Sequence, residues 1–391
     1  MKKRILILNE GGISGGGTEK RIKLLIKEML KDTSVENVHL LRIRTLKNKR
    51  YLKFICKKFG YHESSILGSL FYIYKLISKY NINIIQVHNL PLSCSLPLLS
   101  CLIKKIPMVF YVHDFWVLCP HLVLMHPLKY KLRDCENKLE NCIECSGFIS
   151  YLKCKFKKIM INRCKIGVAP GNKIKDVLQK NNILSNKLKV VRPWIDMNYK
   201  NLDLENISTS SVSIVFVGSL LPYKGAHVFA EALALLKIKG IQVYIAGTDQ
   251  EVEGKYRKNI EALLKDISNV NFLGKLNKNQ LLKLLVKTNI FIMPSIWPEI
   301  FGLVWAEAAY SKNFIIASDV GGISEYVKDI GLVFKNGDAE DLAEKIELCI
   351  DKGYYKDQNI LDRNKQYILD NFNINRAYSE ISEVYDNLIR S

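Results

Sequence analysis

Short apolar runs alternate with helical patterns through the first half of the chain. Strands are expected at residues 5–8, 82–87, 108–112, 166–168 and 188–191. Helical patterns lie between them, at residues 18–30, 67–80 and 172–180. Short strands that are apolar throughout are typical of strands buried on both faces, and the helices between them indicate βαβ units. This pattern predicts a parallel sheet covered by helices.

The alternation pauses around residues 193–212, where a polar stretch shows no apolar period, and then restarts. Strands are expected at residues 213–217, 242–246, 269–273, 290–293, 314–317 and 331–334. Helices are expected at residues 224–237, 279–288, 302–310, 338–350 and 375–389. Because a chain of 391 residues exceeds the usual size of one core, we expect two α/β domains, residues 1–193 and 194–391.

The charge is distributed unevenly between these two halves. Residues 1–193 hold 36 lysines and arginines against 12 acidic residues, a net charge of +24. Residues 194–391 hold 22 against 26, a net charge of −4. The asymmetry indicates an anionic partner for the first half, such as a membrane leaflet, a nucleic acid or a phosphorylated substrate. A lysine-rich solvated surface is the alternative explanation.

Export and membrane insertion are not expected. The N-terminal apolar run is too short for a signal peptide, and no stretch reaches the roughly eighteen apolar residues of a transmembrane helix. The best stretch, residues 90–112, is interrupted by Lys104, Lys105 and three prolines. We therefore expect a cytoplasmic protein with reduced cysteines.

Two glycine-rich loops each follow the first strand of a predicted domain. The first contains Gly15, Gly16 and Gly17 and opens a helix, where free N–H groups and the helix dipole favour an anion. A flexible turn is the alternative, because a glycine-rich turn alone is a weak signal. The second runs from Gly218 to Lys224, which could meet a pyrophosphate as a point charge.

The most specific stretch places two carboxylates eight residues apart. Glu299 lies in a loop after a predicted strand, and Glu307 lies in the helix that follows. Ionised carboxylates accept hydrogen bonds from hydroxyl pairs, while the helix N-terminus can take phosphate oxygens. Hydroxyl pairs at both ends of a diphosphate describe a nucleotide sugar.

Taken together, both glycine-rich loops, residues 113–116 (His-Asp-Phe-Trp) and the Glu299-x7-Glu307 pair resemble family 4 of the retaining glycosyltransferases. The resemblance spans residues 5–389. It implies the GT-B fold, with two Rossmann-like domains whose parallel sheets face across a cleft. The N-terminal domain would bind the acceptor and the C-terminal domain a UDP- or GDP-sugar. We expect the last helix, about residues 375–389, to pack back on the N-terminal domain.

The resemblance also implies roles for individual residues. The catalytic positions would be His113, at the sugar or its reaction centre, and Glu299, at the hydroxyls of the transferred sugar. Glu307 would hold the ribose and Lys224 the diphosphate. The further donor-binding positions would be Gly218, Phe301, Gly302 and Leu303, and the acceptor or phosphate loop would be Gly15, Gly16 and Gly17.

No metal or cofactor is expected at this site. The family acts without a metal-binding Asp-x-Asp motif, and this sequence contains none. Lys224 and the helix dipole would then meet the leaving-group charge. The chain departs from the family at Ser219, where an arginine is frequent. This leaves the diphosphate to Lys224 alone or with a basic residue from elsewhere, such as Lys275.

Four cysteines cluster in an insertion at about residues 117–150 that we expect to be poor in regular structure. They are Cys119, Cys135, Cys142 and Cys145. Four thiolates could form a structural zinc site, with Cys142 and Cys145 as one half. Because the other spacings are irregular, reduced cysteines without metal are the favoured interpretation.

Residues 42–59 and 151–165 interleave cations with aromatic and aliphatic residues. Both stretches resemble basic amphipathic surfaces that rest on anionic lipid. We therefore expect a transferase at the inner face of the plasma membrane, building a cell-surface polysaccharide on a glycan or lipid-linked acceptor. A GT-B enzyme with a soluble acceptor is one alternative. A nucleic-acid-binding α/β protein is the other, although no reader motif accompanies the charge and the two glutamates would repel phosphates.

Overall fold

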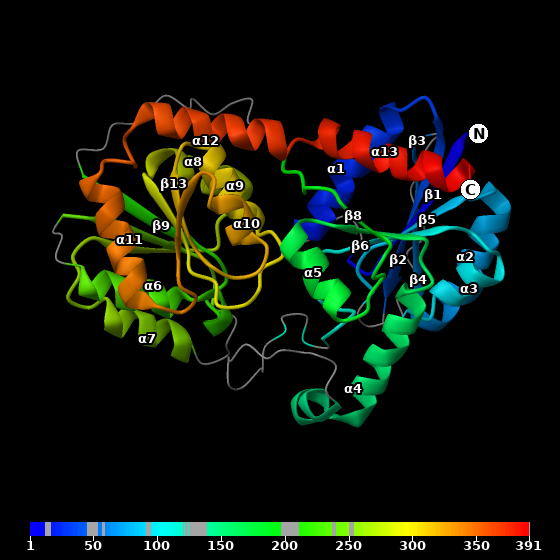
Figure 1. Ribbon diagram of the computed structural model, residues 1–391, viewed down its shortest axis with the longest axis horizontal. Helices are drawn as coiled ribbons and strands as arrows, with labels where there is room; N and C mark the ends of the chain where they lie inside the picture. Colours follow the sequence, from blue (N-terminus) through cyan, green and yellow to red (C-terminus); the bar gives the residue numbers. More distant parts are fainter. Residues whose placement is uncertain are drawn as a thin grey trace. The chain divides into compact units, whose positions relative to one another are not determined.

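The computed structural model describes residues 1–11, 17–44, 54–56, 59–90, 95–119, 121, 124, 139–196, 211–236, 240–249 and 254–390. The chain divides into two compact units (Figure 1). Unit 1 comprises Met1–Asp196 together with Phe372–Ser391, and unit 2 comprises Met197–Asn371. The chain therefore leaves unit 1, forms unit 2 and returns.

Unit 1 is built on a sheet with the strand order β3-β4-β2-β1-β5-β6-β7-β8. Among the described strands, all pairings are parallel except that of β3 with β4. The strands are β1 (Lys3–Asn9), β2 (Val35–Arg44), β3 (Phe54–Cys56), β4 (Phe59–Ser65), β5 (Ile84–Val87), β6 (Met108–Tyr111), β7 (Ile166–Ala169) and β8 (Leu188–Val190). The helices are α1 (Gly17–Lys31), α2 (Ile66–Tyr80), α3 (Leu98–Ile103), α4 (Leu139–Ile161), α5 (Asn172–Lys180) and α13 (Ile374–Arg390).

Unit 2 holds a fully parallel sheet in the order β11-β10-β9-β12-β13-β14. Its strands are β9 (Ser213–Val217), β10 (Gln242–Ala246), β11 (Val270–Gly274), β12 (Ile290–Met293), β13 (Phe314–Ser318) and β14 (Gly331–Phe334). Its helices are η1 (Pro222–Lys224), α6 (Ala226–Leu235), α7 (Lys255–Leu263), α8 (Lys278–Lys287), α9 (Leu303–Tyr310), α10 (Ile323–Val327), α11 (Ala339–Asp351) and α12 (Gln358–Asn371). Two Rossmann-like units with parallel sheets confirm the predicted fold class.

The expectation of an irregular insertion at residues 117–150 is wrong for its second part. Helix α4 begins at Leu139 and continues to Ile161, interrupted only at Gly147, whose φ of 78° and ψ of 164° are not helical. The buried face of α4 includes Tyr151, Cys154 and Ile161. This face fixes the helix to unit 1.

Helix α13 completes the core of unit 1. Its buried side chains Ala377, Ile381 and Val384 belong to one apolar cluster with residues of β1, α1 and β2. Tyr385 donates or accepts a 2.8 Å hydrogen bond with the hydroxyl of Tyr111 on β6. The core of unit 1 is therefore assembled from segments more than 300 residues apart.

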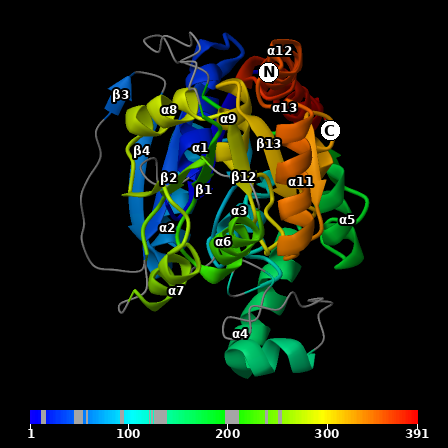
Figure 2. The same ribbon diagram turned by 90° about the vertical axis from the view of Figure 1, so that its left-hand side faces the viewer.

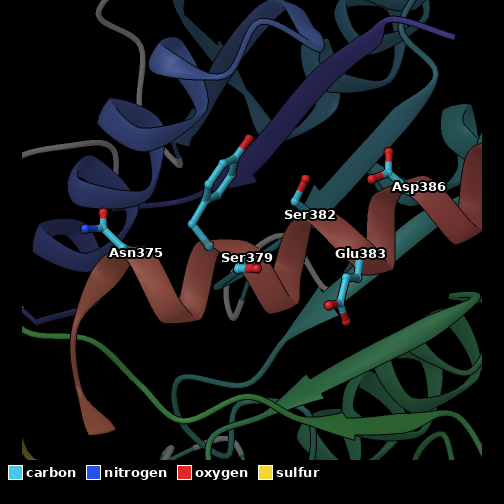
Figure 3. A pocket seen from close by; sticks show the side chains of 6 residues that line it. Asn375, Ser379, Ser382, Glu383 and Asp386 are labelled. Carbon is cyan, nitrogen blue, oxygen red and sulfur yellow. The ribbon is translucent and has the colours of Figure 1, made fainter. Parts of the chain in front are cut away.

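Polar groups attach α13 to the start of β1. The buried Lys3 ammonium lies 2.9 Å from the Asp386 carboxylate and donates to Ser382 Oγ at 2.7 Å. The Tyr378 hydroxyl donates to Asp32 at 2.7 Å. Beside the same helix lies a hollow of about 390 Å³, lined by amide, hydroxyl and carboxylate side chains (Figure 3). Its lining residues are Asn375, Tyr378, Ser379, Ser382, Glu383 and Asp386.

Two buried histidines face each other between β2 and β4. His39 Nδ1 lies 3.0 Å from His62 Nε2, and His62 Nδ1 lies 3.0 Å from the Tyr72 hydroxyl. Gly60 makes room for the pair, because a Cβ there would lie 2.5 Å from His39 Nδ1. Burial lowers the pKa of each histidine to about 4, with neighbouring positive charge adding to the effect. Both imidazoles are therefore neutral at pH 7.

Candidate functional site

Each sheet has a topological switch point, where neighbouring strands continue to opposite sides. In unit 1 β1 lies between β2 and β5, and in unit 2 β9 lies between β10 and β12. In open parallel sheets ligands bind beyond the carboxyl ends of the strands at such points. His113 follows β6 in unit 1, and the Gly218–Lys224 and Glu299 loops follow β9 and β12 in unit 2.

The loops of unit 2 pack backbone against backbone. Gly225, at the end of η1, has a φ of 73°, and a Cβ there would lie 1.7 Å from the carbonyl oxygen of Pro294. A Cβ at Gly247 would lie 1.7 Å from the carbonyl oxygen of Gly218. Glycine is the residue that permits both the left-handed backbone and the close approach. The loops after β9, β10 and β12 are thereby held together.

Glu299 is buried in the loop after β12 and is paired with the ammonium group of Lys224 from η1. The Ser295 hydroxyl donates to the same carboxylate oxygen at 3.4 Å. The Lys224 ammonium also lies 4.9 Å from the ring centroid of Trp297. The structure thus brings together two of the predicted site residues, Lys224 and Glu299.

The loop that carries Glu299 is fixed by the turn after β13. The Gly322 N–H donates to the Glu299 carbonyl oxygen at 2.7 Å. Gly321 has a φ of 58°, and a Cβ there would lie 2.4 Å from that same oxygen. Gly302, with a φ of 67°, then turns the chain into α9. The N–H groups of Phe301, Gly302 and Leu303 belong to the N-terminal end of this helix, where the dipole is positive.

Glu307 lies on the buried face of α9 and contacts Lys278, the first residue of α8. Its carboxylate oxygen lies 2.5 Å from the Lys278 ammonium nitrogen. Sequence reasoning missed Lys278 and suggested Lys275 as a second basic residue. No local signal marks Lys278, because its partner lies 29 residues later in the sequence on another helix. Each candidate carboxylate in unit 2 is therefore paired with one lysine.

In unit 1 His113 belongs to a chain of hydrogen bonds that begins at Arg21 on α1. Arg21 contacts His113 Nδ1, and His113 Nε2 lies 2.7 Å from His88 Nδ1. His88 Nε2 lies 3.0 Å from the amide oxygen of Gln86, whose nitrogen contacts the Tyr385 hydroxyl on α13. Sequence reasoning identified only His113 in this chain. Arg21 lies on α1, whereas Gln86 lies on β5 and His88 directly follows that strand, so no single local motif contains all three.

The two end groups, Arg21 and Gln86, determine which ring nitrogen of each histidine carries the proton in this series of hydrogen bonds. Arg21 can only donate, so His113 Nδ1 accepts. The Gln86 oxygen can only accept, so His88 Nε2 donates and His88 Nδ1 accepts from His113 Nε2. Both imidazoles are then neutral with the proton on Nε2. In this arrangement both ring nitrogens of His113 are engaged by protein groups.

Burial and charge agree with neutral histidines. Burial, followed by the Arg21 charge, lowers the pKa of His88 to about 3. Burial, Arg21 and His88 together hold the pKa of His113 well below its ordinary value. The site therefore presents Arg21 as a cation and His113 as a neutral hydrogen-bonding group at pH 7.

Asp114, next to His113, is fixed by two donors. The Asn89 amide donates to one carboxylate oxygen at 2.7 Å and the Trp116 N–H to the other at 2.8 Å. Burial raises the pKa of Asp114 to about 6, against the lowering effect of these hydrogen bonds. The loop after β6 is therefore held in place by a carboxyl that is costly to ionise.

The N-terminal glycine loop is only partly described. Gly15 and Gly16 lie outside the described residues, and Gly17 is the exposed first residue of α1. Before the gap, a Cβ at Gly11 would lie 1.8 Å from a carboxylate oxygen of Glu19. The described part of the loop is therefore in direct contact with the first turn of α1.

The cysteine cluster is also only partly described. Cys135 and the side chain of Cys142 lie outside the described residues, while Cys119 is buried and Cys145 is part of α4. Among the side chains that the structure describes, no three histidine, cysteine, aspartate or glutamate groups lie close enough to hold a metal ion. Within the same residues, no helix has both the length and the apolar character needed to cross a membrane.

Comparisons with known families cover most of the chain. Residues 16–199 match the model of Glycosyltransferase Family 4, and residues 203–367 match the model of Glycosyl transferases group 1. A Campylobacter jejuni relative, N,N'-diacetylbacillosaminyl-diphospho-undecaprenol alpha-1,3-N-acetylgalactosaminyltransferase, is 29% identical over 161 residues. That match covers 40% of this chain and 41% of the relative. The chain spans less than half the length of the first curated relatives that it matches.

Solved structures share the fold over the whole chain. A glycosyltransferase from Rickettsia africae superposes with a TM-score of 0.73 at 19% identity, covering 100% of this chain and 99% of that one. Anabaena HepE in complex with UDP and glucose superposes with a TM-score of 0.72 at 17% identity, covering 98% and 99%.

Proposed function

Because the chain belongs to the family 4 glycosyltransferases of the GT-B fold, we propose that it is a retaining transferase that uses a UDP- or GDP-sugar. The acceptor is a glycan or a lipid-linked glycan in the synthesis of a cell-surface polysaccharide. Unit 2 binds the donor and unit 1 the acceptor. The protein works as a peripheral protein at the inner face of the plasma membrane.

The observation that carries this proposal is the pair of carboxylate–lysine contacts around α9. Glu299 meets Lys224, and Glu307 meets Lys278, beside the N-terminal end of that helix. A nucleotide sugar needs hydroxyl acceptors at both ends and cationic donors at its centre. The two contacts supply both kinds of group, which supports a nucleotide sugar as the ligand.

Each residue then has a role. Glu307 accepts hydrogen bonds from the ribose and Glu299 from the transferred sugar, while Lys224 and the main chain at Phe301, Gly302 and Leu303 hold the diphosphate. Gly218 lets the ligand approach the backbone, and Gly15, Gly16 and Gly17 face the acceptor or its phosphate. The bond from the anomeric carbon to the diphosphate oxygen breaks, the acceptor oxygen bonds to the same face of that carbon, and the proton of the acceptor hydroxyl passes to the leaving diphosphate.

His113 acts at the sugar as a neutral group. To reach the sugar, one of its ring nitrogens exchanges Arg21 or His88 for a sugar hydroxyl. The negative charge on the leaving diphosphate is met by Lys224 and the N-terminal end of α9, so transfer proceeds without a metal. Two relatives support the substrate classes: HepE is bound to UDP and glucose, and the Campylobacter jejuni enzyme is named for an undecaprenol-linked acceptor.

Ligand-induced stabilisation tests the donor site. UDP, GDP and their sugars are screened by thermal shift, and we expect one base to raise the melting temperature because it binds the native state. Glu307→Ala should weaken binding of that nucleotide by about tenfold or more, since it removes hydrogen bonds to a charged group. Glu299→Ala should mainly lower kcat.

Glu344→Ala, at an exposed position of α11, serves as the matched control and should change neither quantity. Unchanged binding and turnover in both site variants would overturn the donor-site assignment. Steeply salt-dependent binding of DNA or RNA, without a response to nucleotides, would favour the nucleic-acid alternative.

A further inference from the structure

Helix α4 has a buried face and an apolar exposed face. Phe148, Leu152 and Ile159 are 55%, 47% and 57% exposed, and Ile149 is 69% exposed. The first three are four and seven residues apart, so they lie on one side of the helix. The buried Tyr151, Cys154 and Ile161 lie on the other side, against unit 1. A patch of large apolar side chains that is exposed to solvent indicates an interaction surface.

The charges around this face identify the partner. Residues 148–165 contain six lysines and arginines and no acidic residue. Lys153, Lys155 and Arg163 are exposed next to the apolar side chains. An apolar strip edged by cations is the pattern of a helix that lies in the headgroup region of an anionic bilayer. Figures 1 and 2 show α4 extending away from the sheet of unit 1.

We propose that the exposed face of α4, formed by Phe148, Ile149, Leu152 and Ile159 with Lys153 and Lys155, together with Arg163 just after the helix, docks unit 1 on an anionic lipid surface. This inference rests on the proposed function, for which it names the element that meets the membrane. Residues 42–59, the other basic stretch, do not supply such a surface within the described residues: Phe59 is buried and residues 45–53 lie outside them.

The docking helix is in direct contact with the loop that carries His113. Lys157, on the buried side of α4, donates from its ammonium group to the Trp116 carbonyl oxygen at 3.3 Å. Its ammonium also lies 5.7 Å from the centroid of the Trp116 ring. Trp116 in turn donates to Asp114. A lipid surface bound by the exposed side of α4 would therefore lie across the helix from the loop that carries His113, which suits a lipid-linked acceptor.

Sedimentation with vesicles tests the proposal on the full chain. Phosphatidylcholine vesicles with phosphatidylglycerol should bind the protein at low salt, and vesicles of phosphatidylcholine alone should bind far less. Phe148→Ser/Leu152→Ser/Ile159→Ser and Lys153→Glu/Lys155→Glu should each lower the partition coefficient by at least about tenfold, through lost apolar burial and lost attraction respectively. Leu235→Ser/Leu263→Ser, which alters exposed leucines of unit 2, should leave it unchanged.

A parallel thermal shift with the nucleotide separates the two proposals. The α4 variants should keep the full stabilisation by nucleotide, which shows that they are folded and that the donor site is intact. Equal vesicle binding by wild type and α4 variants would overturn the docking surface and leave the proposed function standing. So would a dimer in solution that the α4 variants dissociate, without any lipid binding. Vesicle binding without a response to nucleotides would instead overturn the proposed function.

Discussion

At the residue scale, unit 1 contains four neutral histidines, of which His39, His62 and His88 are buried and His113 is half-buried. His39 and His62 pair between two strands, and His88 and His113 form part of the chain that links Arg21 to Gln86. Burial is the main cause that lowers the pKa of all four. In the unfolded chain each histidine returns to its ordinary pKa near 6.5. The free energy of unfolding of unit 1 therefore depends on pH.

The sign of this dependence follows from proton binding. Below pH 6.5 the histidines bind protons in the unfolded chain but not in the folded one, because their folded pKa values are lower. The stabilisation is therefore present above pH 6.5 and is lost as the pH falls towards 4. We expect the free energy of unfolding of unit 1 to fall by several kcal/mol between pH 7 and pH 5, since each shifted group contributes up to about 1.4 kcal/mol per pH unit.

Urea denaturation at several pH values, with hydrogen exchange to locate the change, measures this loss. His62→Phe removes one of the four groups and should flatten the dependence on pH, whatever its effect on the stability at pH 7. A pH dependence that is the same in wild type and His62→Phe would contradict the assignment for this pair.

At the element scale, glycines with positive φ hold the loops of unit 2 in place. Gly225 and Gly337 have almost the same φ, 73° and 74°. They differ in surroundings, because a Cβ at Gly225 would meet the Pro294 carbonyl oxygen, whereas one at Gly337 would meet nothing within 4 Å. Comparing the same substitution at the two glycines therefore separates the cost of backbone strain from the cost of a steric clash.

Gly337→Ala should cost about 1–3 kcal/mol of stability from strain alone and leave nucleotide binding intact. Gly225→Ala should cost more and also weaken nucleotide binding, because the loops that carry Lys224 and Glu299 must move apart. Chemical denaturation and nucleotide titration of both variants check this. Equal effects of the two substitutions on stability and on binding would show that the contact at Pro294 is unimportant.

The elements that sequence could predict are those with continuous apolar runs. The strands at Ser213–Val217, Gln242–Ala246 and Ile290–Met293 begin and end as predicted, because buried parallel strands carry an unbroken signal. Strand β4 (Phe59–Ser65) was not predicted, since its later residues are polar. Helix α4 was not predicted because its apolar and basic residues are distributed around the helix without a clear helical period. Gly147 also interrupts the helix.

Residue pairs across elements were harder to predict than elements. The sequence indicated Glu299 with Lys224 through their shared resemblance to one family, and the structure places them in contact. Lys278 with Glu307 and His88 with His113 each join separate segments that the strand order brings together. A single sequence contains no local pattern for such contacts.

At the scale of the whole molecule, the two units differ in how the chain builds them. Unit 2 is continuous, whereas unit 1 needs α13 from the far end of the chain. Ile381 on α13 and Ile346 on α11 are both fully buried, the first in the core of unit 1 and the second in that of unit 2. Substituting these two isoleucines one at a time therefore tests which unit each of them stabilises.

Each isoleucine-to-alanine substitution should cost about 2–5 kcal/mol, but in different units. Ile381→Ala should lower hydrogen-exchange protection in β1 and α1, which lie more than 300 residues earlier in the chain, and leave unit 2 protected. Ile346→Ala should do the reverse. Loss of protection in β9 or β12 after Ile381→Ala would contradict the assignment of α13 to unit 1.

The return of the chain to unit 1 also sets the order of events during translation. Residues 1–196 emerge from the ribosome first, yet their core lacks Ala377, Ile381 and Val384 until α13 has been made. Unit 2, which is continuous, can fold on emergence while the earlier half still exposes the apolar side chains that pack against α13. We therefore expect the nascent first half to expose this apolar surface for the time needed to synthesise nearly 200 further residues, about 10–40 s at typical rates.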